Sequence, residues 1–273
     1  MTSPETDKKF SGSIAKLYDT YLVPLIFEPY AADLASRLAA RSLSRVLEIA
    51  AGTGVVTRAL AAALPETVSI VATDLNQAML DQASAVGTRR AVEWRHADAM
   101  QLPFPDGAFD AVVCQFGVMF FPDKAGAFAE VRRVLRSGGV VVFNVWDRLS
   151  ENHFADTVHT AVESVFPGDP PRFMARTPHG YFDRRTVERD LAGGGFAAAP
   201  EIETVAARSR ARSPRIPAVA FCQGTPLRNE IEARDASRLE EATDAAAEAV
   251  ARRFGRGPVE GRMQAHVVTV ERR

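Results

Sequence analysis

Hydrophobic positions in the first 150 residues fall into short apolar runs typical of buried strands. These runs cover residues 46–50, 68–74, 92–98, 110–116 and 140–147. Helical patterns with one apolar face lie between some of the runs, over residues 56–64, 77–86 and 123–135, and Ser137-Gly138-Gly139 is expected to stop the last helix. Alternating strands and helices of this kind predict a doubly wound α/β fold.

The regular alternation of strand and helix patterns ends after Asp147. Two further strands are predicted over residues 201–209 and 264–271, and the interval between them is mostly helical. It includes an Ala/Glu/Arg-rich helix predicted over residues 229–253. The Arg-rich tract 208–215 is interpreted as a solvated linker. A helical insertion between late strands would make a natural cover for a pocket.

A glycine-rich turn, Gly52-Thr53-Gly54, follows the first predicted strand, and Asp74 ends the second. Such glycines let backbone N–H groups approach a nucleotide-type ligand, and an acid at the position of Asp74 can accept both ribose hydroxyls. Glu48 beside the turn would repel a pyrophosphate but suits the ammonium and sulfonium of S-adenosylmethionine. Thr57 stands where a dinucleotide pattern has a third glycine. The pattern therefore favours S-adenosylmethionine over NAD, although the glycines alone would fit a purely structural turn.

Further polar residues end the third and fourth predicted strands, at Asp98 and Gln115. Ligands of open α/β sheets bind beyond the carboxyl ends of the strands, so these groups are expected to share one crevice with Glu48 and Asp74. The Asp98 carboxylate could accept from an adenine amino group while the Ala99 N–H faces the neighbouring ring nitrogen. As alternatives, Asp74 could cap the next helix and Asp98 could form a turn.

Composition narrows the choice of partner. The chain has 273 residues, 47% of them hydrophobic, and a formal net charge of −1, which gives no general attraction to nucleic acid or to acidic membranes. Cys114 and Cys222 lie far apart, the N-terminus has no apolar signal core, and no run approaches the roughly 20 apolar residues of a spanning helix. We expect a cytoplasmic protein with a small-molecule partner, no nucleic acid, no membrane insertion and no metal; a homodimer stays open.

Several motifs recur in order and spacing over residues 45–147. They are Val46-Leu47-Glu48-x-Ala50-x-Gly52-Thr53-Gly54, Thr73-Asp74-Leu75-Asn76-x-x-Met79-Leu80, Ala97-Asp98-Ala99-x-x-Leu102-Pro103-Phe104, Phe109-Asp110 and Val134-Leu135-Arg136-x-Gly138-Gly139. On these residues the chain resembles class I S-adenosylmethionine-dependent methyltransferases, especially the group around the ubiquinone/menaquinone-biosynthesis methyltransferases. The resemblance implies a Rossmann-like sheet of seven strands with a reversed last strand.

The resemblance also assigns roles at the cofactor site. It implies that Glu48 and the turn hold the methionine part, that Asp74 binds the ribose, and that Leu75 and Met79 flank adenine. The same resemblance implies that Asp98 and Ala99 contact adenine's edge and that Gln115 lines the cofactor at the fourth strand. The remaining cofactor-binding candidates lie at the turn that holds the methionine part, namely Ala50, Gly52, Thr53 and Gly54. Ala50 departs from the family, which usually has glycine there, and one added methyl is expected to tighten the turn without abolishing binding.

The segment before the core resembles the family's lid. Tyr18, Tyr21 and Tyr30 lie in it and would cover the cofactor or the acceptor, with Tyr21 on the cofactor side, unless they only pack a helix against the sheet. The expected organisation is an N-terminal helical lid over residues 1–44, a cofactor-binding core over 45–147, and the remaining core strands with a helical substrate cover over 148–273.

Methyl transfer needs few catalytic groups, because the sulfonium already activates the methyl group and positioning of the acceptor supplies most of the rate enhancement. The candidates for the acceptor wall are Phe116, Met119, Phe120 and Trp146, with core packing as the alternative for the first three. No catalytic base is identified; His153 is the only candidate, and an exposed loop position is its alternative. His159, His179 and His266 have no partner pattern in the sequence.

The acceptor can be narrowed only to a class. The sequence at the end of the fourth strand, Gln115-Phe116-Gly117-Val118, lacks the Asn/Asp-Pro-Pro-aromatic motif. That motif is typical of enzymes that methylate amides or the exocyclic amines of nucleic-acid bases. The predicted function is methyl transfer from S-adenosylmethionine to a small molecule with an oxygen, nitrogen or carbon nucleophile, leaving S-adenosylhomocysteine. The alternatives are an NAD-dependent oxidoreductase and a non-catalytic S-adenosylmethionine-binding sensor or scaffold.

Overall fold

The computed structural model describes residues 13–273, so the first twelve residues of the expected lid lie outside the described part. The chain forms two compact units. Unit 1 contains the described residues up to Phe27, together with Trp146–Gly180 and Ala206–Gln264. Unit 2 contains Glu28–Val145, Tyr181–Val205 and Ala265–Arg273.

A seven-stranded sheet has the order β3-β2-β1-β4-β5-β7-β6. Its strands are β1 (Arg45–Ile49), β2 (Ser69–Asp74), β3 (Glu93–His96), β4 (Phe109–Gln115), β5 (Leu135–Trp146), β6 (Glu201–Ala211) and β7 (Val259–Glu271). The first five strands pair in parallel. Strand β7 runs antiparallel to β5, because Gly138 N donates to Arg272 O while Asp147 N donates to Gln264 O. The predicted doubly wound sheet with a reversed last strand is confirmed.

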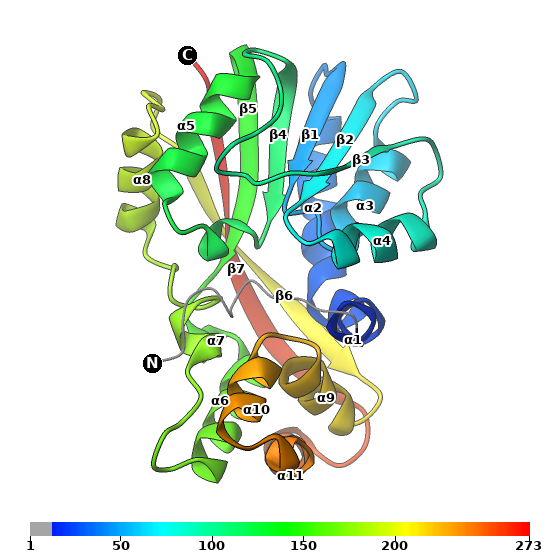
Figure 1. The fold of residues 1–273 in the computed structure, drawn as a ribbon, viewed down its shortest axis with the longest axis vertical. Helices are drawn as coiled ribbons and strands as arrows, with labels where there is room; N and C mark the ends of the chain where they lie inside the picture. Colours follow the sequence, from blue (N-terminus) through cyan, green and yellow to red (C-terminus); the bar gives the residue numbers. More distant parts are fainter. Residues whose placement is uncertain (1–12) are drawn as a thin grey trace. The chain divides into compact units, whose positions relative to one another are not determined.

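The sheet of unit 2 is covered on both faces (Figure 1). Helices α2 (Glu28–Ala39) and α3 (Val55–Ala63) pack on one face, where alternate strand residues such as Val46, Ala111 and Val142 are fully buried with Leu34 and Leu60. On the other face lie α5 (Lys124–Val134) and α8 (Arg184–Gly193). Helix α4 (Gln77–Val86) follows β2 and packs beside β2 and β3. The strand order reverses between β1 and β4, so a crevice at their carboxyl ends is the expected ligand position.

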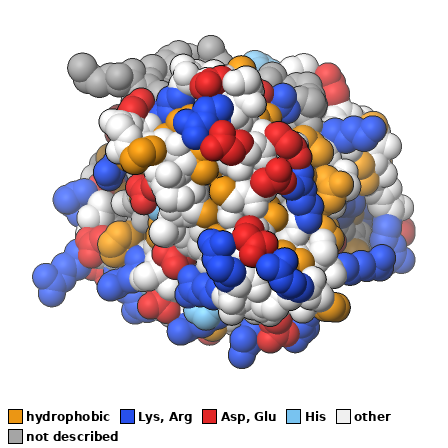
Figure 2. Space-filling view, turned by 90° about the horizontal axis from the view of Figure 1, so that it is seen from below, with side chains coloured by type: hydrophobic (Ala, Val, Ile, Leu, Met, Phe, Trp, Pro, Cys, Tyr) orange, Lys and Arg blue, Asp and Glu red, His pale blue; other side chains and the backbone are white. Residues whose placement is uncertain are grey.

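Unit 1 is mostly helical. Its helices are α1 (Ser13–Leu17), a π-helix (Tyr18–Phe27), α6 (His153–Val165), α7 (Phe173–Arg176), α9 (Arg215–Gln223), α10 (Leu227–Asp235) and α11 (Leu239–Phe254), with short 3₁₀-helices at Leu149–Glu151 and Ala236–Arg238. Helix α11 packs against both α6 and α9. The surface in Figure 2 intersperses basic and acidic side chains, as a net charge near zero leads one to expect. Within residues 13–273 no helix is long and apolar enough to cross a bilayer.

Three sequence predictions need correction. The single helix predicted over residues 229–253 is wrong, because a break at Ala236–Arg238 separates α10 from α11. There Asp235 is extended, and its Oδ1 accepts from the backbone N–H of Ser237 at 3.0 Å. The Arg-rich tract is no linker, since residues 208–211 belong to β6 and Arg215 begins α9.

The third correction concerns Ser137-Gly138-Gly139, which does not stop the helix. Helix α5 already ends at Val134, and the three residues lie within β5. The strand extends that far because Gly138 N donates to Arg272 O at 2.7 Å and Arg272 N donates to Gly139 O at 2.8 Å. The pairing between β4 and β5 is irregular at this point, which accommodates the extra glycines.

Candidate cofactor site

The glycine turn connects β1 to α3 through left-handed backbone. Ala50, Gly52 and Gly54 have φ values of 53°, 56° and 81°. A Cβ at Gly54 would lie only 2.8 Å from the Trp94 ring, so this position needs glycine for space as well as for conformation. The methyl that Ala50 adds is accommodated by a neighbouring glycine, since a Cβ on Gly117 would come within 2.5 Å of it.

Asp74 ties the end of β2 to this turn. Its Oδ2 accepts from Gly52 N at 2.8 Å, and its Oδ1 accepts from Asn76 N at 2.7 Å. Asn76 occupies the N-cap position of α4, so Asp74 does not cap that helix. A carboxylate can accept about four hydrogen bonds, which leaves capacity for a ligand hydroxyl. Burial raises the pKa of Asp74, while the bonds from Asn76 and Gly52 oppose that rise.

Glu48 is buried next to the turn, with 1% of its surface exposed. Its Oε2 accepts from Thr57 Oγ1 of α3 at 2.5 Å, and its Oε1 has no hydrogen-bond partner within residues 13–273. Burial raises the pKa of Glu48 to about 8; the Thr57 hydroxyl opposes the rise, and the nearby Asp74 adds to it. A buried carboxylate without a salt-bridge cation is costly unless a positive group approaches it. We call Glu48, the Gly52-Thr53-Gly54 turn and Asp74 the strand-end site.

The residues predicted to contact adenine follow β2 and β3. Asp98 lies two residues beyond β3 and is exposed, and its Oδ1 accepts from Met100 N at 2.9 Å. The turn-forming role considered for it is therefore present in the structure. Leu75 is 43% exposed, so its apolar side chain is accessible to a ligand, whereas Met79 is buried. Ala99 is half-buried.

Aromatic candidates for the acceptor wall follow β4. Phe116 is buried and has a φ of 51°, which is rare for a residue with a side chain. Tyr30 meets it edge-on, with ring centroids 5.3 Å apart, and donates its hydroxyl to Val205 O at 3.1 Å. Gln115, at the end of β4, and Phe120 are both half-buried.

Other predicted residues belong to unit 1. Tyr18 and Tyr21 lie in the π-helix and are half-buried. Trp146, which ends β5, is buried between Phe27 and a histidine ring. His153 stacks on Phe254 with centroids 6.1 Å apart, and its Nδ1 accepts from Arg262 N at 3.3 Å. Burial and the charges of Arg253 and Arg262 lower the pKa of His153.

Three further residues make contacts that were not predicted from the sequence. Thr57 binds Glu48, and its place on the first turn after the glycines was the available signal. Asn144 is buried in β5, where its Oδ1 accepts from Phe116 N at 2.9 Å while its Nδ2 has no hydrogen-bond partner among residues 13–273. His179 is bonded to Asp147 O at 2.9 Å, a contact across 32 residues that no local pattern reveals.

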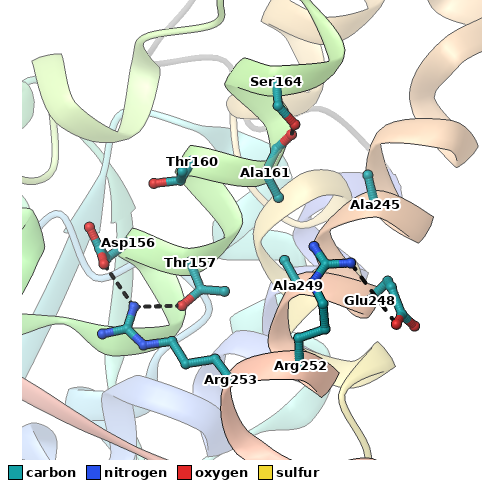
Figure 3. Close-up of a pocket in the computed structure, with 10 residues that line it drawn as sticks. All are labelled: Asp156, Thr157, Thr160, Ala161, Ser164, Ala245, Glu248, Ala249, Arg252 and Arg253. Carbon is teal, nitrogen blue, oxygen red and sulfur yellow. Dashed lines mark hydrogen bonds and ion pairs between the residues drawn. The ribbon is translucent and has the colours of Figure 1, made fainter.

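A cavity of about 680 Å³ lies on the surface of unit 1 between α6 and α11 (Figure 3). Its charged side chains already have partners: Arg253 bonds to Asp156 and Thr157 at 2.9 Å each, and Arg252 approaches Glu248 at 4.0 Å. The remaining lining residues are small or hydroxylated, namely Thr160, Ala161, Ser164, Ala245 and Ala249. None of the predicted site residues lines this cavity. No group of three or more potential metal ligands occurs in the described part of the chain.

The strand-end site fits S-adenosylmethionine. The hydroxyl of Thr53 is buried and has no hydrogen-bond partner in the described part of the chain, which is unfavourable for the protein alone. Oε1 of Glu48 can accept from an ammonium group, and Asp74 can accept from ribose hydroxyls. A pyrophosphate would meet two buried carboxylates instead, so the donor set disfavours a dinucleotide.

Comparison with known proteins agrees with this geometry. Residues 47–143 match the family described as a methyltransferase domain. The chain is 31% identical to the ubiquinone/menaquinone biosynthesis C-methyltransferase of Ectopseudomonas mendocina over 56% of this chain and 65% of the relative. It is 30% identical to the enzyme of the same description from Saccharophagus degradans, over 58% and 68%. The matches therefore span about two thirds of the length of these relatives.

The fold agrees with a solved methyltransferase. The phosphoethanolamine N-methyltransferase 2 of Haemonchus contortus, in complex with S-adenosyl-L-methionine, superposes with a TM-score of 0.61 at 16% identity, covering all of this chain and 61% of that one. At this identity the likeness establishes the fold alone. Together with the curated relatives, it leads to one conclusion: the chain belongs to the class I S-adenosylmethionine-dependent methyltransferases and uses S-adenosylmethionine as its cofactor.

Proposed function

We propose that the protein is an enzyme that methylates a small molecule at an oxygen, nitrogen or carbon atom. The single observation that carries the proposal is the pair of buried carboxylates, Glu48 and Asp74, on either side of the glycine turn. The cofactor supplies an activated methyl group on a sulfonium. Glu48 and Thr53 bind the methionine part, Asp74 binds the ribose, and the backbone of Gly52 and Gly54 allows close approach.

The remaining cofactor contacts are proposed from the same resemblance and the observed positions. Leu75 and Met79 flank adenine, Asp98 and Ala99 bind its edge, and Gln115 lines the cofactor at the end of β4. Two observations support these roles: Oδ2 of Asp98 has no hydrogen-bond partner among the described residues, and Leu75 is exposed. Ala50 adopts the left-handed backbone at the start of the turn, and its methyl does not prevent cofactor binding.

For the acceptor we propose contacts with Phe116, Phe120 and Tyr30 of unit 2 and with Trp146 and Tyr18 of unit 1. Tyr21 is proposed to contact the cofactor. Residues 1–44 and 148–273 would supply the cover around the core of residues 45–147. The relatives' printed names concern C-methylation in quinone biosynthesis; we extend to this chain only a partly apolar acceptor. His153 stays a candidate base, testable as His153→Phe.

The proposal includes two further expectations, on the cellular location and on the oligomeric state. Cys114 and Cys222 are buried free thiols, which supports a reducing, cytoplasmic environment. A homodimer is testable by light scattering. An oxidoreductase or a sensor function has no observation in its favour.

The test is calorimetric titration with S-adenosylmethionine, S-adenosylhomocysteine and NADH. We expect binding of the two sulfur ligands, none of NADH, and loss of binding in Asp74→Ala. Asp81→Ala is the matched control, because this exposed aspartate of α4 bonds only to the Gln77 side chain. Failure of the wild type to bind either sulfur ligand would overturn the proposal. Binding without methyl transfer to any metabolite extract would favour the sensor alternative.

A further inference from the structure

Strand β3 lies at the edge of the sheet and pairs with β2. In this register His96, the last residue of β3, lies opposite Asp74, the last residue of β2. One further backbone bond follows, from Ala97 N to Asp74 O at 3.1 Å. The chain then bends at Leu75, between β2 and α4, so Leu75 lies beyond the paired part of the two strands.

The backbone of this bend is bonded to the His96 side chain. Nε2 of His96 lies 2.8 Å from the carbonyl oxygen of Leu75. A carbonyl oxygen can only accept, so Nε2 carries a proton and donates. A side chain of β3 therefore bonds to a carbonyl that lies outside the strand pairing.

Leu75 combines a fixed backbone with an accessible side chain. On its N-terminal side the carboxylate of Asp74 accepts from Gly52 N at 2.8 Å and from Asn76 N at 2.7 Å. The Leu75 side chain is nevertheless 43% exposed, and among the described residues only Val86, at the end of α4, is a second large hydrophobic residue with comparable exposure. A side chain on a fixed backbone can pack against a ligand with little loss of conformational freedom.

His96 also has an electrostatic influence on the site. Burial raises the pKa of Asp74, and a positive charge on His96 opposes that rise, although less than the bonds from Asn76 and Gly52 do. The two influences of His96 depend on different chemistry. The bond to Leu75 needs an N–H at the position of Nε2, whereas the electrostatic influence needs a protonated ring.

We propose that His96 is a positioning residue of the cofactor site, which holds the Leu75 backbone so that the Leu75 side chain packs against the adenine ring of S-adenosylmethionine. This inference rests on the proposed function, in which Leu75 flanks adenine. His96 acts through Leu75 and not by contact with the cofactor. Without its bond the bend would have to be ordered during binding, so the contribution of His96 appears as affinity.

The test compares two amides at position 96 by calorimetric titration of the full-length protein with S-adenosylhomocysteine. His96→Gln places an amide N–H near the position of Nε2, where it can donate to Leu75 O; His96→Asn is shorter and places it near Nδ1, out of reach. We expect His96→Gln to bind within about twofold of the wild type and His96→Asn about fivefold more weakly, as the loss of one hydrogen bond predicts. Neither amide carries a charge, so affinity retained in His96→Gln identifies the bond as the cause.

Glu93→Ala is the matched control. Glu93 is an exposed residue of the same strand, and its carboxylate lies 3.9 Å from Arg95, so this variant should bind like the wild type. A double-mutant cycle then separates positioning from a general effect on β3. In a Leu75→Ala background His96→Asn should cause no further loss of affinity, because the side chain through which His96 acts is absent.

Wild-type affinity in His96→Asn, or equal losses in His96→Gln and His96→Asn, overturns the proposal. A full further loss in the Leu75→Ala background also overturns it. His96 is exposed on an edge strand, so we expect each variant to fold, as circular dichroism would verify. Each of these outcomes leaves the methyltransferase proposal standing, because the wild type still binds S-adenosylhomocysteine; absence of wild-type binding would overturn both proposals.

Discussion

The strand-end site of unit 2 and the ring contacts of Tyr18, Phe27, Trp146 and His179 in unit 1 are built in different ways. In unit 2 the polar groups follow parallel strands, whose carboxyl ends meet at one edge of the sheet, so each group is placed by its own strand. In unit 1, Tyr18, Trp146 and His179 come from distant segments joined by side-chain contacts. The difference shows why a sequence motif can predict residues that follow parallel strands and cannot predict residues that only tertiary contacts bring together.

The largest expected effect tests the steric basis of the strand-end site. Gly54→Val places a side chain at φ 81° and within 2.8 Å of Trp94. The left-handed backbone and the overpacking together should lower the free energy of unfolding by about 4 kcal/mol, measured by urea denaturation. Gly138→Val is the control: its φ is 74°, and no described atom lies within 4 Å of a Cβ placed there, so only the cost of a positive φ, about 1–3 kcal/mol, applies. Equal losses in the two variants would contradict the steric argument.

The second prediction addresses unit 1. Asn152→Ala removes the side chain that bridges Asp147 and Gln264 and leaves buried backbone groups without partners. We expect a loss of about 3 kcal/mol in the free energy of unfolding. Gln77→Ala removes an amide that is exposed and bonded only to Asp81, and should change stability by less than about 0.5 kcal/mol. If Asn152→Ala were as mild as this control, the bonds of Asn152 to Asp147 and Gln264 would not stabilise unit 1.

The third prediction concerns pH at Glu48. Its pKa is raised from 4.5 to about 8 by burial, so the folded protein holds a proton that the unfolded chain releases. This contribution to stability is full below pH 4.5 and is lost as the pH rises through about 8. The free energy of unfolding of the cofactor-free protein should therefore decrease by up to about 1.4 kcal/mol per pH unit within that window. Glu48→Gln should lack this part of the decrease.

Cofactor binding should show the opposite trend at the same residue. The ionised form of Glu48 attracts the ammonium and sulfonium charges, so affinity for S-adenosylmethionine should rise from pH 6 to pH 8 in the wild type. Glu48→Gln should bind more weakly and with little pH dependence. A wild-type affinity that is flat over this range would show that Glu48 does not face the ligand's positive charge.

The fold was largely predictable because strand and helix periodicity is local. Four of the first five predicted strands agree with β1 to β4 within two residues, and the fifth lies within β5 apart from Asp147. The exceptions depend on non-local contacts: β5 starts early because β7 pairs with residues 138 and 139, and the helix over residues 229–253 breaks where Asp235 caps a new turn. No element was predicted for residues 148–200, where α6, α7 and α8 lie.

The same limit applies to the sites. Glu48 and Asp74 could be found because their strands place them beside the glycine turn. Asn144 and His179 could not, since their partners lie 28 and 32 residues away along the chain. Nothing in the local sequence marks a histidine whose tautomer depends on a distant carbonyl.

The smallest expected effect concerns Ala50, which stands where the family usually has glycine. Ala50 has a φ of 53°, which costs a residue with a side chain about 1–2 kcal/mol. Ala50→Gly relieves that strain but increases the conformational entropy of the unfolded chain by roughly 0.5–1 kcal/mol. We therefore expect a net stabilisation of about 0.5 kcal/mol, measured by urea denaturation. Ala51→Gly, at a buried position without a positive φ, has the entropic cost and also loses the packing of its methyl, so it should be destabilising. If both variants destabilise equally, the methyl of Ala50 contributes packing against Gly117 that offsets its backbone strain, and the strand-end site tolerates alanine for that reason.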